Sequence, residues 1–469
     1  MLITIDNRYM SISGCNLSLV REFDRRTAPF LEGHQYNVAY QNKWWDGREH
    51  LVKKVRKAGW KAPSGLYEEL RNLCDEKGII VTADDRRKKD YAAVAVNWDS
   101  AVILRPYQIE AVEAAICERG LGTGKGLLRL ATRSGKTVIA AGIISKLKLK
   151  TLFIVQSEML LSQTVALFKR VLCVEIGQIG GGLWQTSGIT VASVQTLVKH
   201  SDDEATKALL AESGVVFFDE CHHISGEKWR AILTACDSLY KFGLSATIPD
   251  IGIGDTTQKG AIWLKASCGP ILYDLPVSSL INQGWLIRPT IRLHVVTGNI
   301  AVTDYGTAYR LGITDNAKRN MIIAVEAAAY VKQGLSVLVV TNRIEHVEIL
   351  EKVLLDAGLR IGVVTGTVRP QKRRQLVAQY VNHELDVLLG TLFGEGVDIP
   401  SINVVINAEG GKDEKQTMQR FRNLTPADGK TKAVFVDFMD NQHPYLAGHS
   451  LERLKTYREN EAFNFEVVR

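Results

Sequence analysis

Short apolar runs alternate with longer amphipathic stretches from about residue 105 to residue 440. The runs are mostly β-branched or aromatic and the stretches between them have helical patterns, which predicts parallel strands joined by crossover helices. The first series is TLFIVQ (151–156), ITVAS (189–193), VVFFD (215–219) and FGLSA (242–246); the second is SVLVVT (336–341), IGVVTG (361–366), DVLLGT (386–391), INVVINA (402–408) and KAVFVDF (432–438). Two series predict two α/β lobes, each built on a parallel sheet.

Residues 1 to about 100 lack this alternation and carry aromatic and charged residues instead. The stretch YQNKWWDGREHLVKKVRKAGWK (40–61) is typical of them, and we expect a separate small α+β domain here. At the start of the chain, MLITIDNRYMSIS (1–13) favours a short strand with early charges over a signal peptide.

A connector, NQGWLIRPTIRLHVV (282–296), separates the two lobes, because Gly284 and Pro289 interrupt its pattern. After the last apolar run, SLERLKTYRENEA (450–462) predicts a helix and FNFEVV (463–468) predicts a final strand. The predicted domains are therefore residues 1–98, residues 99–286 and residues 287–469.

The composition is typical of a globular protein with two or three domains, since the 469 residues are 46% hydrophobic and 23% charged. The net charge of +7 at pH 7 suits a polyanionic partner. No apolar run approaches the roughly eighteen residues that span a bilayer, so we expect no membrane partner. Seven scattered cysteines, without a C-x-x-C pair, argue against a zinc module or a disulfide framework and favour a reducing compartment.

Two Gly-Lys pairs in GTGKGLLRLATRSGKTVIAA (122–141) compete as a phosphate-binding turn. Such a turn needs a strand before it, backbone N–H groups that converge on phosphate, a lysine, and then a hydroxyl residue for Mg²⁺. Lys136 meets these requirements, whereas Lys125 is followed by Gly126 and precedes the strand, so we expect Lys125 to be solvated in a flexible turn. The predicted phosphate-binding residues are Thr132, Arg133, Ser134, Gly135, Lys136 and Thr137, with Thr137 also a magnesium ligand.

This turn departs from the G-x-x-x-x-G-K-[ST] pattern, because Leu130 and Arg133 stand where glycine is usual. A bare G-K-T triplet is common by chance, so the signals around it decide its meaning. VVFFDECHH (215–223) is an apolar strand that ends in Asp219, which could hold Mg²⁺ through water, and Glu220, which could orient or deprotonate an attacking water. Taken alone, these acids would equally suit a helix N-terminus.

Together these stretches resemble the superfamily 2 helicases and translocases in the order and spacing of their motifs, over about residues 105 to 440. The resemblance implies two RecA-like lobes in tandem that bind ATP and Mg²⁺. The matching segments are LRPYQIEAV (104–112), LATRSGKT (130–137), LFIVQSEMLLSQ (152–163), VASVQTL (191–197), DECHH (219–223), SAT (245–247), GTLFGEGVDIP (390–400) and QTMQRFRNLTP (416–426). Beyond the phosphate-binding turn, the nucleotide contacts that it implies come from Arg105, Gln108, Gly396, Asp398 and Gln416.

The last of these motifs departs from the family pattern, which is close to Q-x-x-G-R-x-x-R. Gln419 stands where glycine is expected, and Asn423 stands where the second arginine is expected. An arginine finger stabilises charge on the γ-phosphoryl oxygens and contributes about 10³–10⁵ in rate. We expect Arg420 to be the finger, with Arg422, one place early, as its rival or partner.

A motor with two lobes holds nucleic acid by phosphate contacts across both of them. Polar residues at the ends of predicted strands are candidate contacts, because open α/β sheets bind ligands there. They are Ser193, Gln195, Thr341, Asn342, Arg343, Thr365, Gly366 and Thr391. Each of them taken singly is equally compatible with an ordinary cap or turn.

The DExH motif and the compact second lobe are most similar to the XPB and UvsW branch, which acts on duplex and branched DNA. NKWWDGREHLV (42–52) and SGLYEELRNLCDEKGIIVTADDRR (64–87) resemble the N-terminal domain of UvsW-like phage helicases. Residues 43–61 contain seven Lys or Arg and only two acidic residues. The aromatic rings of this stretch could stack on exposed bases. The DNA contacts expected in this domain are Trp44, Trp45, Lys53 and Lys54. Adjacent tryptophans in a strand face opposite sides, so we expect one to be buried and one exposed.

The sequence therefore predicts an ATP-dependent DNA helicase or translocase that remodels branched DNA by branch migration, fork regression or D-loop disruption. We expect a monomer in the cytoplasm, which is that of the host if a phage encodes the chain. Two alternatives stay open: a DExH helicase that unwinds RNA, and a non-unwinding protein whose ATP site switches its affinity for nucleic acid. No nuclease constellation is evident.

Overall fold

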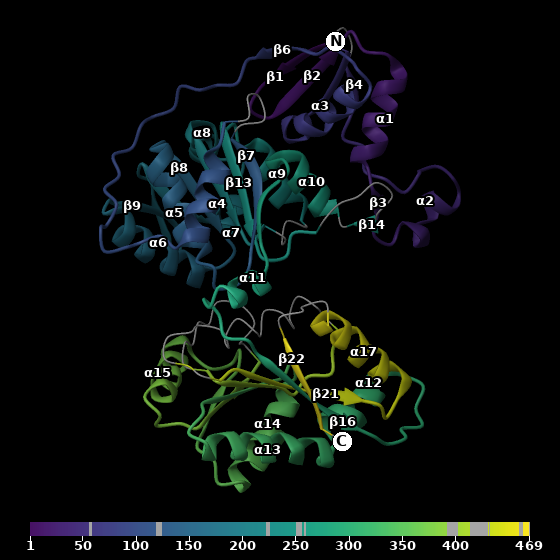
Figure 1. The fold of residues 1–469 in the computed structure, drawn as a ribbon, viewed down its shortest axis with the longest axis vertical. Coiled ribbons are helices and arrows are strands. Elements are labelled where there is room, and N and C mark those ends of the chain that lie inside the picture. Colours follow the sequence, from purple (N-terminus) through teal and green to yellow (C-terminus); the bar gives the residue numbers. More distant parts are fainter. Residues whose placement is uncertain are drawn as a thin grey trace. The chain divides into compact units, whose positions relative to one another are not determined.

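The chain forms two compact units, Met1–Pro276 and Val277–Arg469. The structure is a computed structural model that describes residues 1–55, 59–118, 124–221, 226–249, 256–257, 259–391, 402–412, 430, 432–458 and 463–468. The predicted fold class is confirmed, since two mainly parallel sheets follow a small mixed sheet along the chain (Figure 1). The two boundaries between the three domains predicted from the sequence stay predictions.

The first unit contains an eight-stranded sheet in the order β10-β9-β11-β8-β12-β13-β7-β15. Neighbouring strands run parallel, except that β10 is antiparallel to β9 at one edge. The strands are β7 (Lys125–Leu130), β8 (Thr151–Val155), β9 (Ile176–Gly180), β10 (Leu183–Gln185), β11 (Ile189–Ser193), β12 (Val215–Asp219), β13 (Tyr240–Ser245) and β15 (Ile271–Leu275). The helices are α4 (Pro106–Ile116), α5 (Lys136–Leu147), α6 (Glu158–Leu172), α7 (Val194–Lys199), α8 (Glu204–Glu212), α9 (Glu227–Ala235) and α10 (Lys259–Cys268).

Side chains of the central strands alternate between two faces of this sheet, and every residue of β8, β11 and β12 is buried. On one face Phe153, Phe217 and Phe242 lie in a row, with neighbouring ring centroids 5.5 and 5.3 Å apart. Phe168 of α6 meets Phe153 edge-on at 5.1 Å. On the other face Phe218 packs in a cluster with residues of α7, α8, α9 and α10. Burial on both faces explains why these strands appear in the sequence as continuous apolar runs.

The first part of the chain forms a five-stranded sheet in the order β4-β5-β2-β1-β6. Its elements are β1 (Leu2–Ile5), β2 (Tyr9–Ser13), α1 (Leu17–Thr27), β4 (Lys53–Val55), β5 (Gly59–Pro63), α3 (Tyr67–Glu76) and β6 (Thr82–Asp85). The expected single strand at residues 1–13 is therefore a hairpin of two antiparallel strands. Apolar residues of β1 and β2 pack against the apolar sides of α1 and α3.

This N-terminal sheet shares its core with the large sheet's outer helix α10. Ile262 and Ala266 of α10 belong to the same buried cluster as the residues of β1, β2, α1 and α3. Gly65 lies so close to α10 that a Cβ atom there would be 2.4 Å from the carbonyl oxygen of Ala266. The close approach fixes the N-terminal sheet against α10 within the first unit.

Lys125, the first residue of β7, is buried beside this contact and only 5% exposed. Its Nζ donates to the carbonyl oxygen of Asn7 at 3.0 Å and to the hydroxyl of Ser64. Burial lowers the pKa of the Lys125 ammonium well below its ordinary value, because the charged form loses its hydration. The expectation of a solvated lysine is wrong, since residues far away in the sequence cover it.

An arm of residues 28–50 extends from α1 and is joined to the large sheet's periphery at a second place. Its strand β3 (Phe30–Leu31) pairs in parallel with β14 (Thr256–Thr257), and it also carries the short helix α2 (Val38–Gln41). Glu49 accepts a hydrogen bond from Trp263 Nε1 at 3.1 Å and pairs with Lys259 Nζ at 2.9 Å. The arm is therefore attached to the segment that follows β13.

The second unit contains a seven-stranded sheet in the order β18-β19-β17-β20-β21-β16-β22, with every described pair parallel. The strands are β16 (Thr290–Val296), β17 (Val337–Val340), β18 (Ile361–Val364), β19 (Val387–Gly390), β20 (Val404–Asn407), β21 (Val434–Asp440) and β22 (Asn464–Val468). The helices are α11 (Val277–Asn282), α12 (Tyr305–Tyr309), α13 (Ala317–Lys332), α14 (Ile344–Asp356), α15 (Pro370–Val381) and α17 (Pro444–Arg458), and a π-helix spans Arg310–Thr314. Apolar residues of α13 and α14 cover one face of this sheet.

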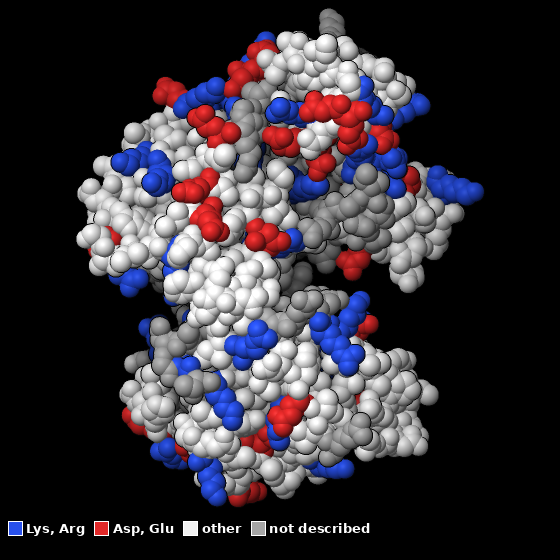
Figure 2. Space-filling model, in the orientation of Figure 1, with Lys and Arg blue, Asp and Glu red and all other residues white. Residues whose placement is uncertain are grey.

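The surface carries both signs of charge. Figure 2 shows Lys and Arg interspersed with Asp and Glu on the displayed face of both units. Within the described part of the chain, no helix combines the length and the apolar character needed to cross a bilayer.

We expect Gly65→Ala to lower the unfolding midpoint of the full chain. The new Cβ would lie 2.4 Å from the oxygen of Ala266 and 2.8 Å from the nitrogen of Gly269, which are backbone atoms that cannot turn aside. Overpacking of this kind costs about 1–3 kcal/mol. Gly448→Ala in α17 is the control, because nothing lies within 4 Å of its Cβ and a helix gains from alanine. Equal midpoints for Gly65→Ala and the unchanged chain would contradict the close approach.

Candidate functional site

The turn between β7 and α5 places backbone N–H groups at the start of a twelve-residue helix. Gly135 has φ +80° and Arg133 has φ +67°, so two residues of the turn adopt the left-handed conformation that favours glycine. This conformation costs a non-glycine residue about 1–2 kcal/mol, which explains why glycine is usual at the position of Arg133. The turn has the backbone shape of a phosphate-binding loop despite its unusual sequence.

Gln108 in the first turn of α4 is hydrogen-bonded to this turn. Its Nε2 donates to the carbonyl oxygen of Ser134 at 2.9 Å, and its Oε1 accepts from the backbone N–H of Arg105 at 2.9 Å. A Cβ atom on Gly135 would lie 2.6 Å from the same Nε2. Gln108 is 5% exposed, and both ends of its amide are therefore used to tie the start of α4 to the turn.

Lys136 and Glu220 come together across the sheet edge. Lys136 begins α5, Glu220 directly follows β12, and Lys136 Nζ lies 2.5 Å from Glu220 Oε1. Their side chains are 13% and 21% exposed, so the ion pair is partly desolvated. Glu220 has φ +46°, a second strained non-glycine residue at this edge, and strain of this kind gathers at functional sites.

Asp219 and Ser245 complete this edge, because each is the last residue of its strand, β12 or β13. Asp219 is 6% exposed, and the Ser245 hydroxyl accepts a hydrogen bond from the backbone N–H of Thr247 at 3.1 Å. In the described residues, the buried Ser134 hydroxyl has no hydrogen-bond partner. A nucleotide fits this donor set, since a helix N-terminus, a lysine and a buried hydroxyl lie at the same end of the sheet as Asp219, which can hold a hydrated cation. Thr132 and Thr137, also predicted here, are both partly exposed.

Two predicted contacts for nucleic acid lie at the end of β11 in the same sheet. Ser193 is buried and donates from Oγ to Gln195 Oε1 at 2.7 Å, while Gln195 donates to the carbonyl oxygen of Gln156. Gln195 is exposed, so its amide is the part of this pair that a nucleic-acid strand could contact.

The second unit gathers its predicted contacts at one sheet edge. Asn342 and Arg343 follow β17, Gly366 follows β18, and Thr391 follows β19, and these three strands are neighbours. Asn342 and Gly366 are exposed, and Arg343 and Thr391 are partly exposed. Thr341 and Thr365 are buried instead and bond within the unit, to His346 at 3.1 Å and Thr367 at 2.8 Å.

The paired tryptophans of the arm behave differently from each other. Trp44 is 81% exposed, whereas Trp45 is partly buried and donates from Nε1 to the carbonyl oxygen of Arg48 at 2.8 Å. One ring is exposed as expected, but the other is only partly buried, and both lie in a turn after α2 and not in a strand. Lys53 and Lys54 lie exposed on β4.

Five predicted nucleotide or catalytic residues lie outside the described residues. They are Gly396, Asp398, Gln416, Arg420 and Arg422. Their roles stay predictions.

Sequence reasoning missed a group of buried polar residues in the second unit. Tyr309 and Glu409, with the arginines Arg319 and Arg453, form hydrogen bonds around the segment that follows β20. The adjacent glycines of AEGGK (408–412) were the available sequence signal, since paired glycines often mark close packing of backbone.

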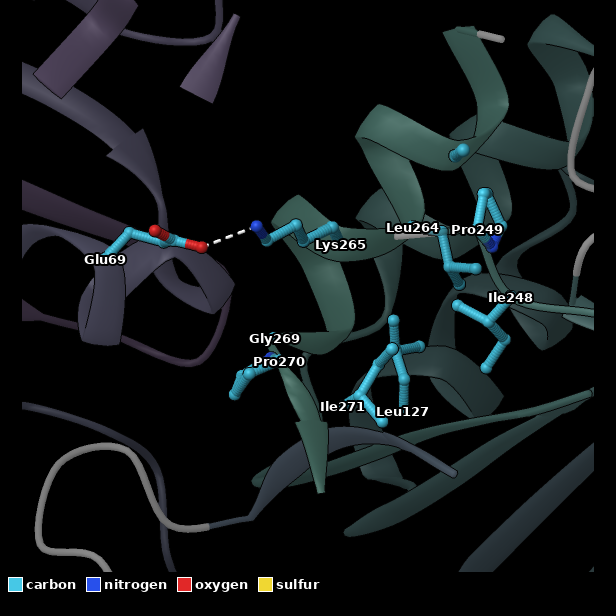
Figure 3. Close-up of a pocket in the computed structure, with 10 residues that line it drawn as sticks. Glu69, Leu127, Ile248, Pro249, Leu264, Lys265, Gly269, Pro270 and Ile271 are labelled. Atoms are coloured by element: carbon cyan, nitrogen blue, oxygen red, sulfur yellow. Dashed lines mark ion pairs between the residues drawn. The ribbon is translucent and has the colours of Figure 1, made fainter. Parts of the chain in front are cut away.

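A cavity of about 340 Å³ lies elsewhere, between α3 and the first lobe. Figure 3 shows Leu127, Ile248 and Leu264 among its apolar lining, with the ion pair of Glu69 and Lys265 at 2.5 Å beside it. Its described lining includes none of the predicted site residues.

Two family models match the chain, and together they cover more than half of it. The model described as "Type III restriction enzyme, res subunit" matches residues 101–250. The model described as "Helicase conserved C-terminal domain" matches residues 318–422. Each model falls on one of the two large sheets.

Relatives by sequence include two named helicases or translocases. "DNA 3'-5' translocase XPB2" of Sulfurisphaera tokodaii is 26% identical over 391 residues, which are 76% of this chain and 84% of that protein. "Putative ATP-dependent helicase IRC3" of Saccharomyces cerevisiae is 25% identical over 366 residues, which are 72% of this chain and 52% of that protein. The chain thus spans about half the length of IRC3.

Solved structures share the fold. A fragment of a putative HsdR subunit of a type I restriction enzyme from Vibrio vulnificus covers 86% of this chain and 74% of its own, with 18% identity and a TM-score of 0.59. The crystal structure of T4 UvsW covers 100% of this chain and 99% of its own, with 19% identity and a TM-score of 0.45.

We expect Gln108→Ala to destabilise the first unit by about 1–3 kcal/mol, because it leaves the carbonyl of Ser134 and the N–H of Arg105 without their partner. Thermal unfolding of the full chain measures this change. Gln333→Ala is the matched control, since the exposed Gln333 also donates to a carbonyl oxygen, that of Ala329 at 3.0 Å, and its loss should cost less than about 0.5 kcal/mol. Similar midpoints for the two variants would show that the loop does not depend on Gln108.

Proposed function

The chain belongs to the superfamily 2 helicases, and we propose on this premise that it is an ATP-dependent DNA helicase or translocase that remodels branched DNA. The proposal rests mainly on the arrangement at the ends of β7 and β12 in the first unit. Lys136 follows the predicted phosphate-binding turn, Asp219 ends β12, and Glu220 pairs with Lys136. Branch migration, fork regression and D-loop disruption are the expected reactions, within replication, recombination or repair.

In this proposal ATP with Mg²⁺ supplies the phosphoryl group and the metal charge when bound. The backbone of residues 132–135 and the Lys136 ammonium hold phosphate oxygens. Thr137 and Asp219 hold the magnesium ion, directly or through water. Arg105 would contact the adenine, and Gln108 holds the turn through its hydrogen bond to the carbonyl oxygen of Ser134.

Glu220 serves as the base that orients or deprotonates the attacking water. Glu220 is paired with Lys136 in the structure, so a lysine that held phosphate would leave this carboxylate to a water molecule. Arg420 is the proposed arginine finger, with Arg422 as its rival or partner, and Gly396, Asp398 and Gln416 complete the nucleotide contacts.

DNA is the proposed partner rather than RNA. XPB2, to which most of this chain aligns, is named as a DNA translocase, and the net charge of +7 suits a polyanion. The contacts would come from the exposed or partly exposed polar residues at the two sheet edges. They are Gln195, Asn342, Arg343, Gly366 and Thr391, and the buried Ser193 would support them by holding the Gln195 amide. We propose that one monomer carries out the reaction.

Branch recognition is assigned in this proposal to the N-terminal sheet and its arm. Trp44 offers an exposed ring for stacking on an unpaired base, and Lys53 and Lys54 offer charges for phosphate. Trp45 is proposed to support the turn that presents Trp44, because its indole N–H is bonded to Arg48.

Steady-state ATPase with and without DNA tests the motor. We expect Lys136→Ala to abolish turnover, because the phosphate-binding ammonium is lost. Lys125→Ala should change turnover per folded molecule by no more than a few-fold. It should lower the free energy of unfolding by about 1–3 kcal/mol, since the carbonyl of Asn7 and the hydroxyl of Ser64 lose their partner.

Turnover that depends on Lys125 and not on Lys136 would overturn the assignment of the ATP site. Little stimulation by DNA in the unchanged chain would instead favour a binding protein that ATP only switches.

Trp44→Ala and Trp45→Ala should separate recognition from stability. Base stacking is worth about 1–3 kcal/mol, so Trp44→Ala should weaken binding to a four-way junction about fivefold or more at an unchanged unfolding midpoint. Trp45→Ala should lower the midpoint, because it removes a partly buried ring and its hydrogen bond. Junction affinities and midpoints of both variants, measured in one buffer, give the answer. An unchanged junction affinity for Trp44→Ala would remove the arm from branch recognition.

A further inference from the structure

The segment Ala408–Lys412 follows β20 and leads into the residues that carry Gln416, Arg420 and Arg422. Two buried arginines hold its backbone carbonyls. Arg319 donates to Ala408 at 2.7 Å and to Glu409 at 3.3 Å, and Arg453 donates to Gly411 at 2.6 Å. Charged donors on three of four successive carbonyl groups leave this stretch of backbone little freedom.

Each of these arginines is itself fixed by a buried acid. Arg319 pairs with Asp440 at 3.0 Å, and Arg453 pairs with Asp437 at 2.9 Å, with side-chain exposures of 2% or less. Breaking a buried pair of this kind is strongly destabilising, so the two pairs hold the carbonyl side of the segment rigidly. The segment can change conformation only through its other contacts, which are the N–H of Gly410 and the side chain of Glu409.

Tyr309 of α12 makes the first of these contacts. Its hydroxyl accepts a hydrogen bond from the backbone N–H of Gly410 at 3.3 Å and donates to Asn342 Oδ1 at 3.1 Å. Asn342 in turn donates from Nδ2 to Glu409 Oε1 at 2.9 Å. A Cβ on Gly410 would lie 2.8 Å from side-chain carbons of Ile313, so a substitution here would require Ile313 to shift.

The other side of this group faces the predicted DNA contacts. Arg343 lies over the Tyr309 ring, with its Cζ 4.3 Å from the ring centroid, and Asn342 is exposed although its amide is bonded inward. Tyr309 itself is 1% exposed. A phosphate that draws Arg343 or the Asn342 amide outward must therefore disturb the hydroxyl that binds Gly410.

We propose that Tyr309 and Glu409 are positioning residues that connect the DNA-facing end of β17 to the backbone entering the arginine-bearing segment, so that bound DNA raises the rate of ATP hydrolysis. This inference rests on the proposed function, because it needs a DNA contact at Asn342 and Arg343. The local change is a two-state one: the amide of Asn342 is bonded either to Tyr309 and Glu409 or to DNA.

The test measures the ratio of ATP turnover with DNA to turnover without it, together with the Kd for DNA. Tyr309→Phe keeps the ring under Arg343 and removes only the hydroxyl, so we expect the ratio to fall about tenfold while Kd stays within about twofold. Tyr305→Phe is the matched control, because it removes a hydroxyl from the neighbouring ring of α12, 5.9 Å away, and it should keep the ratio.

Deuterium exchange in a peptide covering residues 404–412 gives a second readout that does not depend on turnover. We expect DNA to change exchange at this segment in the unchanged chain and to leave it unaltered in Tyr309→Phe. If Tyr309→Phe does not fold, Glu409→Ala replaces it, because it breaks the bond to Asn342 and keeps the carbonyl that Arg319 binds.

The outcomes separate the two proposals. DNA stimulation in the unchanged chain with an equal ratio in Tyr309→Phe overturns this inference and leaves the proposed function standing. Absence of DNA stimulation in the unchanged chain overturns the proposed function, and this inference falls with it. If Tyr309→Phe lowers the ratio and weakens DNA binding to the same extent, Tyr309 belongs to the DNA-binding surface, and this inference is overturned.

Discussion

A parallel sheet places the end of every strand at the same edge, and the chemistry of this protein depends on that constraint. In the first unit β7, β12 and β13 end at one edge and deliver the phosphate-binding turn, the Asp219–Glu220 pair and Ser245 to it. In the second unit β17, β18 and β19 deliver Asn342, Gly366 and Thr391 in the same way. Strands buried on both faces keep these edges fixed, and the strained turns at Arg133 and Glu220 are borne by that rigidity.

The sequence predicted the central strands and the residues at their ends, because burial on both faces leaves uninterrupted apolar runs such as VVFFD (215–219). It did not predict β9, β10 and β15, which lie at or near the edges of the first sheet. The expected connector at residues 282–296 is wrong in its second half, because Thr290–Val296 form β16 between β21 and β22. The turn between β7 and α5 was predicted to bind phosphate from the order strand, turn, lysine and hydroxyl, and the left-handed φ of Arg133 accounts for the position that did not match.

Contacts between distant parts of the chain were beyond such reasoning. Lys125 appears solvated from its neighbours in sequence, yet Asn7 and Ser64 bury it. Likewise, nothing in the pattern around Tyr309 shows that its hydroxyl meets Gly410, about a hundred residues later. Local pattern reports which face of an element is buried, whereas the identity of the group that covers it is settled by the tertiary fold. The tryptophans of the arm are a further example. The sequence predicted that one of Trp44 and Trp45 is exposed, but it did not predict the turn that determines which one.

The central claim is that ATP hydrolysis by this chain remodels branched DNA. The most direct test is one strand-displacement assay that compares a DNA four-way junction, a DNA fork, a tailed DNA duplex and an RNA duplex under the same conditions. We expect ATP-dependent product from the junction and the fork, faster than from the tailed duplex, and none from the RNA duplex. Faster processing of the RNA duplex, or ATP-dependent changes in binding without any displaced strand, would contradict it.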